Sequence, residues 1–274
     1  MHAIIKTACN ALKTEGFEGF YETLIEDLIP NLKTTYVEFI NRTNRATLPL
    51  TSQKDALFYS MAYDKGHHLT FTKVLQDNIV FDESDDIINI IDYGCGQGNA
   101  TLATLAHIAK FRDPQTTHLN IHLIEPSKIS LGNAKYKIEV FAKALGFSAN
   151  ITKQNVMLAD AELPDFANDN DTLHLMSYIL DIDDVQDELS IVTDQIKELP
   201  GKNFVIASGV NRHCGKYGFQ LLSRLLTGKT QYIKSYNLPH QRYDIFEGEY
   251  SSHTAKAVGM MVEVHNTYSQ KLAA

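Results

Sequence analysis

Residues 87 to 101 constrain the fold of this 274-residue chain more than any other stretch. They read I-I-N-I-I-D-Y-G-C-G-Q-G-N-A-T, an apolar run that ends in an acid and then in the glycines Gly94, Gly96 and Gly98. An Ala- and Leu-rich stretch follows at once, over residues 100 to 109. The pattern predicts a buried parallel strand, a tight turn and the start of a helix. The glycines let the turn adopt unusual backbone angles and let a ligand approach the unpaired N–H groups of the helix.

The spacing of these glycines separates the ligand classes that use such turns. A dinucleotide site needs G-x-G-x-x-G, but the third glycine comes one residue early and Asn99 stands in its place, which disfavours a nicotinamide dehydrogenase. A phosphate-binding P-loop needs a Lys-Ser/Thr pair after the last glycine, and none follows here. An acid followed by G-x-G-x-G resembles the first motif of the class I S-adenosylmethionine (SAM) dependent methyltransferases. A glycine-rich turn without a ligand is the alternative interpretation.

Apolar segments and helical patterns alternate after residue 86, which predicts a parallel sheet with helices between its strands. The resemblance to class I methyltransferases implies a Rossmann-like, doubly wound, mostly parallel seven-stranded sheet with helices on both faces. Helices are expected over 98–111, 127–145, 185–199 and 217–226. The expected strands are 87–92, 119–125, one within 150–159, 172–178, 203–208, one at 232–236 or 242–246, and 255–264.

The first 84 residues differ from the rest, because their apolar residues recur at helical spacing only. We therefore expect an N-terminal helical cap or lid over residues 1–84 and a class I methyltransferase-like, SAM-binding domain over residues 85–274. In many relatives the segment before the first strand folds over the cofactor. The cap is large enough to enclose a small substrate.

The carboxyl ends of parallel strands are where open sheets bind their ligands, and Glu125 ends the second strand. A carboxylate at this position can accept hydrogen bonds from both hydroxyl groups of a ribose. A surface acid, or an acid that stabilises the next helix, is the alternative. The stretch from Ile121 to Ser127 also resembles the second motif of the class I methyltransferases, which implies that Pro126 and Ser127 border the adenine.

The remaining cofactor contacts follow from the third and fourth motifs of the same family. Spacing favours Asn155 for the adenine contact, whereas the local string around Asp160 resembles the family motif better, and both stay open. Ser177 and Tyr178 end the fourth strand without the prolines of the adenine and glutamine N-methyltransferases, which disfavours that chemistry. The resemblance implies these cofactor-binding residues: Asp92, Gly94, Cys95, Gly96, Gly98, Glu125, Pro126, Ser127, Asn155, Asp160, Ser177 and Tyr178.

The reaction that the resemblance implies is methyl transfer from SAM to an acceptor, with S-adenosylhomocysteine as product. A small-molecule acceptor is favoured; a protein or RNA acceptor, or a non-catalytic SAM-binding module that acts through a partner, are the alternatives. No catalytic string follows Ser177. The candidates for a general base are His68, Tyr63 and His213, beside His67 and Tyr59. Arg212 and Lys216 could bind an anionic acceptor or form a basic surface loop.

Composition narrows the remaining function classes. A net charge of −8 argues against a broad nucleic-acid interface, which needs clustered Lys and Arg. The three cysteines are too far apart for a disulfide framework or a zinc spacing, which predicts a cytoplasmic protein. The histidines show no metal-binding spacing, and no apolar run is long enough to span a membrane. The sequence does not indicate an oligomeric state.

Overall fold

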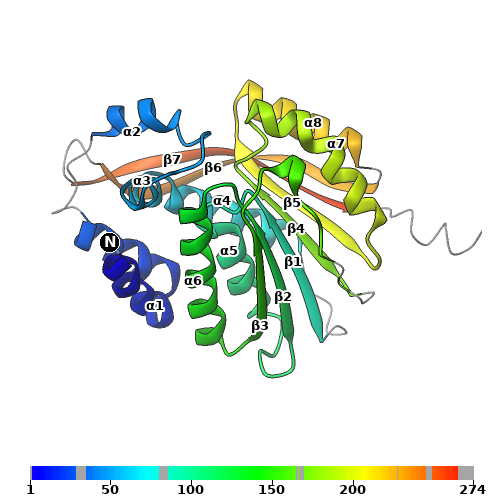
Figure 1. Ribbon diagram of the computed structural model, residues 1–274, viewed down its shortest axis with the longest axis horizontal. Helices are drawn as coiled ribbons and strands as arrows, with labels where there is room; N and C mark the ends of the chain where they lie inside the picture. Colours follow the sequence, from blue (N-terminus) through cyan, green and yellow to red (C-terminus); the bar gives the residue numbers. More distant parts are fainter. Residues whose placement is uncertain are drawn as a thin grey trace, which may run out of the picture.

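A seven-stranded sheet with the order β3-β2-β1-β4-β5-β7-β6 forms the centre of the molecule (Figure 1). The computed structural model describes residues 2–28, 35–79, 86–164, 166, 170–226, 228–244 and 249–264. Strands β1 to β5 are parallel, whereas β7 is antiparallel to both β5 and β6. The predicted mostly parallel, seven-stranded Rossmann-like sheet is confirmed. The first five strands are β1 (Ile87–Tyr93), β2 (His118–Ile124), β3 (Ser148–Gln154), β4 (Thr172–Ser177) and β5 (Asn203–Val210).

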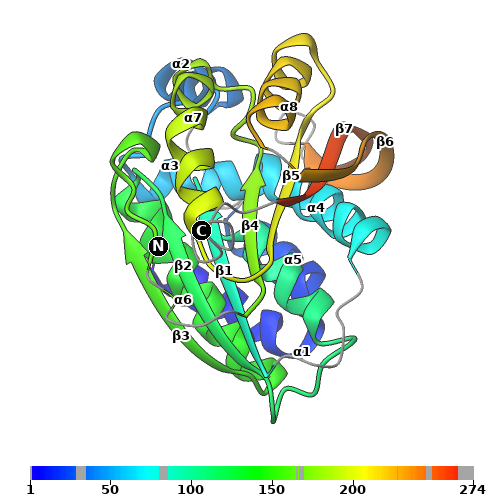
Figure 2. The ribbon, with the colours of Figure 1, turned by 90° about the vertical axis from the view of Figure 1, so that its right-hand side faces the viewer.

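Helices cover both faces of the sheet, as predicted (Figures 1 and 2). Two separate apolar cores result, because successive side chains of a strand point to opposite faces. Ile88 and Ile90 of β1 belong to the core under α5 (Asn99–Ile108) and α6 (Lys128–Leu145). Ile91 and Tyr93 belong to the core under α7 (Asp183–Glu198) and α8 (His213–Leu225).

The N-terminal segment is helical in all of its regular structure, as predicted for the part of it that the structure describes. Its core residues join those of α5 and α6 in one continuous cluster on the same face of the sheet. Helix α1 contacts α6, and α4 contacts α5 as well as β5 and β7. The proposed boundary at residue 84 lies outside the described residues and stays a prediction. The helices are α1 (His2–Leu28), α2 (Tyr36–Thr43), α3 (Gln53–Tyr59) and α4 (Lys65–Asn78), with a π-helical turn, Ser60–Asp64, between the last two.

The largest departure from the predicted elements is a long C-terminal hairpin of β6 (Gly228–Asp244) and β7 (Glu249–Val264). Strand β6 includes residues 232–236 and extends to 244, so it reaches both alternative positions, of which 245 and 246 lie outside the described residues. Strand β7 begins at 249 rather than 255. Outside its buried end the burial of β7 alternates between exposed and half-buried residues, so the sequence carries no apolar run there. Helix α8 also begins earlier than expected, at residue 213.

The outer part of this hairpin, residues 237–244 and 249–256, extends past the sheet and is called the hairpin arm here. Only Ala257–Val264 of β7 pairs with β5, whereas β6 and β7 pair along their whole length. The arm lies against the N-terminal helices, where Arg242 Nη1 donates to the carbonyl oxygen of Ala62 at 3.3 Å. Within the described part of the chain, no helix has the length and apolar character that a membrane crossing requires.

Candidate functional site

The glycine turn at the end of β1 has the backbone that its sequence predicts. Gly94, Gly96 and Gly98 have φ angles of 58°, 50° and 81°, in the left-handed region that favours glycine. A side chain at Gly94 would overlap Ile179, and one at Gly98 would crowd Ala134 of α6. The turn therefore needs glycine both for its angles and for its close neighbours.

Asp92 lies beneath this turn rather than in a pocket. It is fully buried, and its Oδ2 accepts a hydrogen bond from Thr101 Oγ1 at 2.7 Å. Burial raises the pKa of Asp92 to about 7 from its usual 3.8, against the hydrogen bonds from Thr101. Asp92 thus ties β1 to the first turns of α5 and positions the glycine turn. A direct cofactor contact by Asp92 stays a prediction without geometric support.

Glu125 directly follows β2 and connects two backbone segments. Its Oε2 accepts from the Gly96 N–H at 3.0 Å, and its Oε1 accepts from the Ser127 N–H at 2.9 Å. The residue is 8% exposed, and burial raises the pKa of its carboxyl while the two backbone donors oppose that rise. Each oxygen retains a further lone pair for an outside donor.

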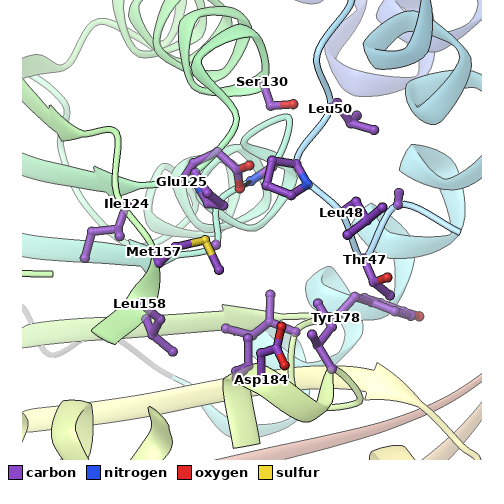
Figure 3. A pocket seen from close by; sticks show the side chains of 18 of the residues that line it. Thr47, Leu48, Leu50, Ile124, Glu125, Ser130, Met157, Leu158, Tyr178 and Asp184 are labelled. Carbon is purple, nitrogen blue, oxygen red and sulfur yellow. Dashed lines mark hydrogen bonds between the residues drawn. The ribbon is translucent and has the colours of Figure 1, made fainter. Parts of the chain in front are cut away.

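A pocket with about 910 Å³ of empty space opens at the carboxyl ends of these strands (Figure 3). Six of the twelve predicted cofactor-binding residues line it, namely Gly94, Gly96, Glu125, Pro126, Ser177 and Tyr178. The sequence reasoning missed many of the other lining residues. Those not singled out beforehand are Ala46, Thr47, Leu48, Pro49, Leu50, Gln97, Ile124, Ser130, Met157, Leu158, Ile179, Ile182, Asp184, Val185 and Glu188.

The segment after β3 resolves the geometry of the third motif. Asn155 is exposed, and its amide donates to the carbonyl oxygens of Glu125 and Pro126 at 2.9 and 2.8 Å. Asp160 is exposed and also does not line the pocket. Between them, Val156, Met157 and Leu158 present apolar side chains to the pocket. The two adenine-contact predictions, Asn155 and Asp160, remain untested.

Ser127 holds the N-terminal segment against the sheet. Its Oγ donates to the carbonyl oxygen of Leu50 at 2.6 Å and accepts from the N–H of Ser130, as the N-cap of α6. Ser127 itself does not line the pocket, but this bond keeps residues 46–50 at its edge. Cys95 and Gly98 do not line the pocket either. Burial raises the pKa of the Cys95 thiol.

Replacing Ser127 by alanine is expected to lower the free energy of unfolding by about 1 kcal/mol, because an N-cap hydrogen bond is lost. The loss of the Leu50 contact should also loosen residues 46–50. Urea unfolding measures the first effect, and amide hydrogen exchange over residues 46–50 measures the second. Unchanged amide exchange over residues 46–50 would contradict the inference that Ser127 holds this segment at the edge of the pocket.

Tyr178 follows β4 with a φ angle of 59°, which is rare for a residue other than glycine. Its N–H donates to the Ser208 carbonyl oxygen at 2.7 Å, and its hydroxyl lies 3.1 Å from Thr70 Oγ1. Its ring stacks on His67 with a centroid distance of 3.6 Å. The strained backbone thus directs Tyr178 onto α4, at the boundary of the pocket.

Of the residues considered as a general base, only Tyr59 lines the pocket. The Tyr59 hydroxyl lies 3.3 Å from His67 Nδ1. Burial lowers the pKa of His67 to about 3, so its imidazole is neutral near pH 7. Tyr63, His68 and His213 do not line the pocket: Tyr63 bonds Tyr36, His68 stacks on Phe17 in a separate crevice, and His213 is exposed on α8.

The basic stretch after β5 also lies elsewhere. Arg212 and Lys216 do not line the pocket, and residues 213–216 form the first turn of α8 rather than a loop. In the described ranges, no group of three or more His, Cys, Asp and Glu residues could hold a metal ion.

No protein-family model and no curated protein matches the chain. Among solved structures, it is similar to precorrin-6y C5,15-methyltransferase from Geobacter metallireducens, with 12% identity, 77% of this chain and 90% of that chain covered, and a TM-score of 0.43. It is also similar to a TehB-like SAM-dependent methyltransferase from Corynebacterium glutamicum, with 10% identity, 84% and 96% covered, and a TM-score of 0.38. A third similar structure is geranyl diphosphate C-methyltransferase from Streptomyces coelicolor. Its identity to this chain is 9%, the match covers 70% of this chain and 78% of that chain, and the TM-score is 0.37.

The fold is assigned from the order and direction of the strands in the sheet. Its five parallel strands, its antiparallel hairpin and the acid-and-glycine turn after β1 agree with what the sequence motifs imply. Together they give this chain a Rossmann-like α/β fold around a mostly parallel, seven-stranded sheet.

Proposed function

We propose that this protein is a SAM-dependent methyltransferase that acts on a small molecule held against its N-terminal helices. The observation that carries this proposal is the position of Glu125. Its carboxylate follows β2, bonds the left-handed glycine turn after β1, and lines the same pocket as that turn. Such a carboxylate can take both hydroxyl groups of a ribose.

The pocket residues fit the parts of this cofactor in order along the sheet. Glu125 has lone pairs left for the ribose, and Val156, Met157 and Leu158 offer an apolar surface to an adenine ring. Gly94 and Gly96 leave bare backbone beside the N-terminus of α5 for the methionine end.

The chain's own residues would supply binding, alignment and exclusion of water. When bound, SAM provides an activated methyl group, so the protein need not create the reactive species. Tyr59 and Tyr178 border the pocket where α4 meets the end of β4, and residues 46–50 close its edge. Holding an acceptor in line between these walls lowers the entropic barrier to transfer.

A small acceptor is favoured over RNA or protein for two reasons. The N-terminal segment forms one edge of the pocket, so the acceptor side is enclosed by Leu48, Leu50 and Tyr59 among others. The lining residues that the structure describes include three carboxylates and no Lys or Arg, which opposes a nucleic-acid phosphate.

Calorimetric titration of the wild-type protein with SAM, S-adenosylhomocysteine and NAD tests the proposal. SAM and its product should bind, and NAD should not. Replacing Glu125 by alanine should weaken both binding constants about 10- to 100-fold, because hydrogen bonds to a charged group contribute about 1.5–3 kcal/mol.

Glu162→Ala is the matched control, because Glu162 is an exposed acid on the segment after β3 that does not line the pocket. It should leave both affinities within about twofold, a change of less than 0.5 kcal/mol. Failure of wild-type protein to bind either SAM or its product would remove the proposal. Binding of SAM without transfer to any acceptor in the panel described below would favour the non-catalytic module instead.

A further inference from the structure

The side of the pocket formed by the start of α7 carries an unpaired carboxylate. Asp184 is exposed on the first turn of α7, and its side chain is directed into the pocket (Figure 3). Within the described part of the chain, its carboxylate makes no hydrogen bond or ion pair. The other two acids of the lining are engaged, since Glu125 accepts from two backbone N–H groups and Glu188 accepts from the Ala159 N–H at 3.0 Å.

The charge of the pocket is one-sided. Glu125, Asp184 and Glu188 line it, and no Lys, Arg or His is among the lining residues that the structure describes. An anionic acceptor would meet like charges here without a cationic partner, which is unfavourable in a partly desolvated site. A cation would gain a counter-charge, and the net charge of −8 acts in the same direction.

Aromatic rings complete this environment. Tyr59 and Tyr178 line the pocket, and His67 backs both of them through its contact with the Tyr59 hydroxyl and its stack on Tyr178. Tyrosine faces attract ammonium groups and tolerate the apolar carbon atoms attached to them. Leu48, Ile182 and Val185 add apolar surface to the same pocket.

We propose that the acceptor carries a positively charged nitrogen, as an alkylammonium or quaternary ammonium group. Asp184 is the counter-charge that determines this specificity. This inference rests on the proposed function. An acid in the first turn of a helix also stabilises the helix dipole. Asp183 occupies the same turn of α7, is exposed and does not line the pocket, so it separates the two roles.

The test uses probe pairs that share an apolar group and end in opposite charges, such as 2-phenylethylamine with 3-phenylpropionate, and a panel of shorter and bulkier pairs. Each is titrated into protein saturated with S-adenosylhomocysteine, and transfer is followed by mass spectrometry with methyl-deuterated SAM. At least one amine should bind about tenfold or more tightly than its carboxylate. Asp184→Asn should remove this preference, whereas Asp183→Asn should retain it within about twofold.

Several results would overturn the inference. These are a preference for carboxylates, the absence of binding by every amine in the panel, or a preference that Asp184→Asn reduces no more than Asp183→Asn does. Saturation with S-adenosylhomocysteine is measured first and depends on Glu125, not on Asp184. Protein that does not bind this compound refutes the proposed function itself, whereas protein that binds it without a preference for amines refutes the cationic acceptor and the role of Asp184 but leaves the proposed function standing.

Discussion

Replacing Asp92 by asparagine is expected to stabilise the protein increasingly as the pH rises from about 4 to 8. In the folded state burial raises the pKa of this carboxyl from 3.8 to about 7, so the folded chain keeps its proton to a higher pH than the unfolded chain. Its contribution to the free energy of unfolding is therefore full below about pH 4 and is lost as the pH rises toward 7. At about 1.4 kcal/mol for each pH unit, the loss is about 4 kcal/mol. Asparagine carries no charge and avoids this loss.

Urea unfolding of wild type and variant across this pH range measures the effect as a difference of two free energies. The difference is needed because burial also lowers the pKa of His67, His68 and His174, and these groups make wild type and variant alike less stable at low pH. Asp187→Asn, an exposed acid on α7, is the control and should show a nearly constant difference. A constant difference for Asp92→Asn as well would show that the carboxyl is not desolvated in the folded protein.

The second large effect concerns Gly218 in α8, where alanine should lower the free energy of unfolding by about 3 kcal/mol. A Cβ at this position would overlap the carbonyl oxygen of Leu180, which belongs to the backbone and cannot rotate away. The same oxygen accepts a hydrogen bond from Gln186 Nε2 at 2.7 Å. Because Leu180 lies two residues after Tyr178, the displacement should also weaken ligand binding at the pocket.

Gly132 in α6 offers the opposite case. It lies inside a helix, and a Cβ there would have no heavy atom within 4 Å, apart from the helix's own nearby backbone. Gly132→Ala should raise the free energy of unfolding by about 0.5–1 kcal/mol, from the higher helix propensity of alanine. Thermal and urea unfolding of both variants compare the signs. Unchanged stability in Gly218→Ala would contradict the close approach of α8 to Leu180, and a loss of stability in Gly132→Ala would contradict the open surroundings of Gly132.

Much of the fold could be predicted because its strongest local signals agree with one another. β1 is an apolar run that ends at glycines, and α6 lies between the N-cap Ser127 and the left-handed Gly146. The start of α8 was missed because its N-cap residue, Arg212, provides no side-chain cap. The extent of the hairpin was missed because only the end of β7 that pairs with β5 is fully buried.

Some residues of the candidate site could also be predicted from the sequence, whereas others could not. Gly94, Gly96 and Glu125 could be placed because each lies within three residues of the carboxyl end of a parallel strand. Leu48 and Asp184 could not, because they reach the pocket from an N-terminal loop and from the start of α7. Their positions depend on how distant segments pack, which local patterns do not encode. Cofactor binding by the predicted residues itself remains a prediction.

The C-terminal hairpin of β6 and β7 affects the order in which the chain can fold during synthesis. Lys234 pairs with Asp77 across 157 residues of sequence, and Arg242 bonds Ala62 across 180. On the ribosome, the π-helical turn Ser60–Asp64 and helix α4 emerge long before β6 and β7, which contact them, and closing such distant contacts is slow. Nascent chains that lack β6 and β7 therefore expose the apolar side of α4. We expect chaperones to bind nascent chains at this stage of synthesis, and C-terminal truncation to affect α4 most.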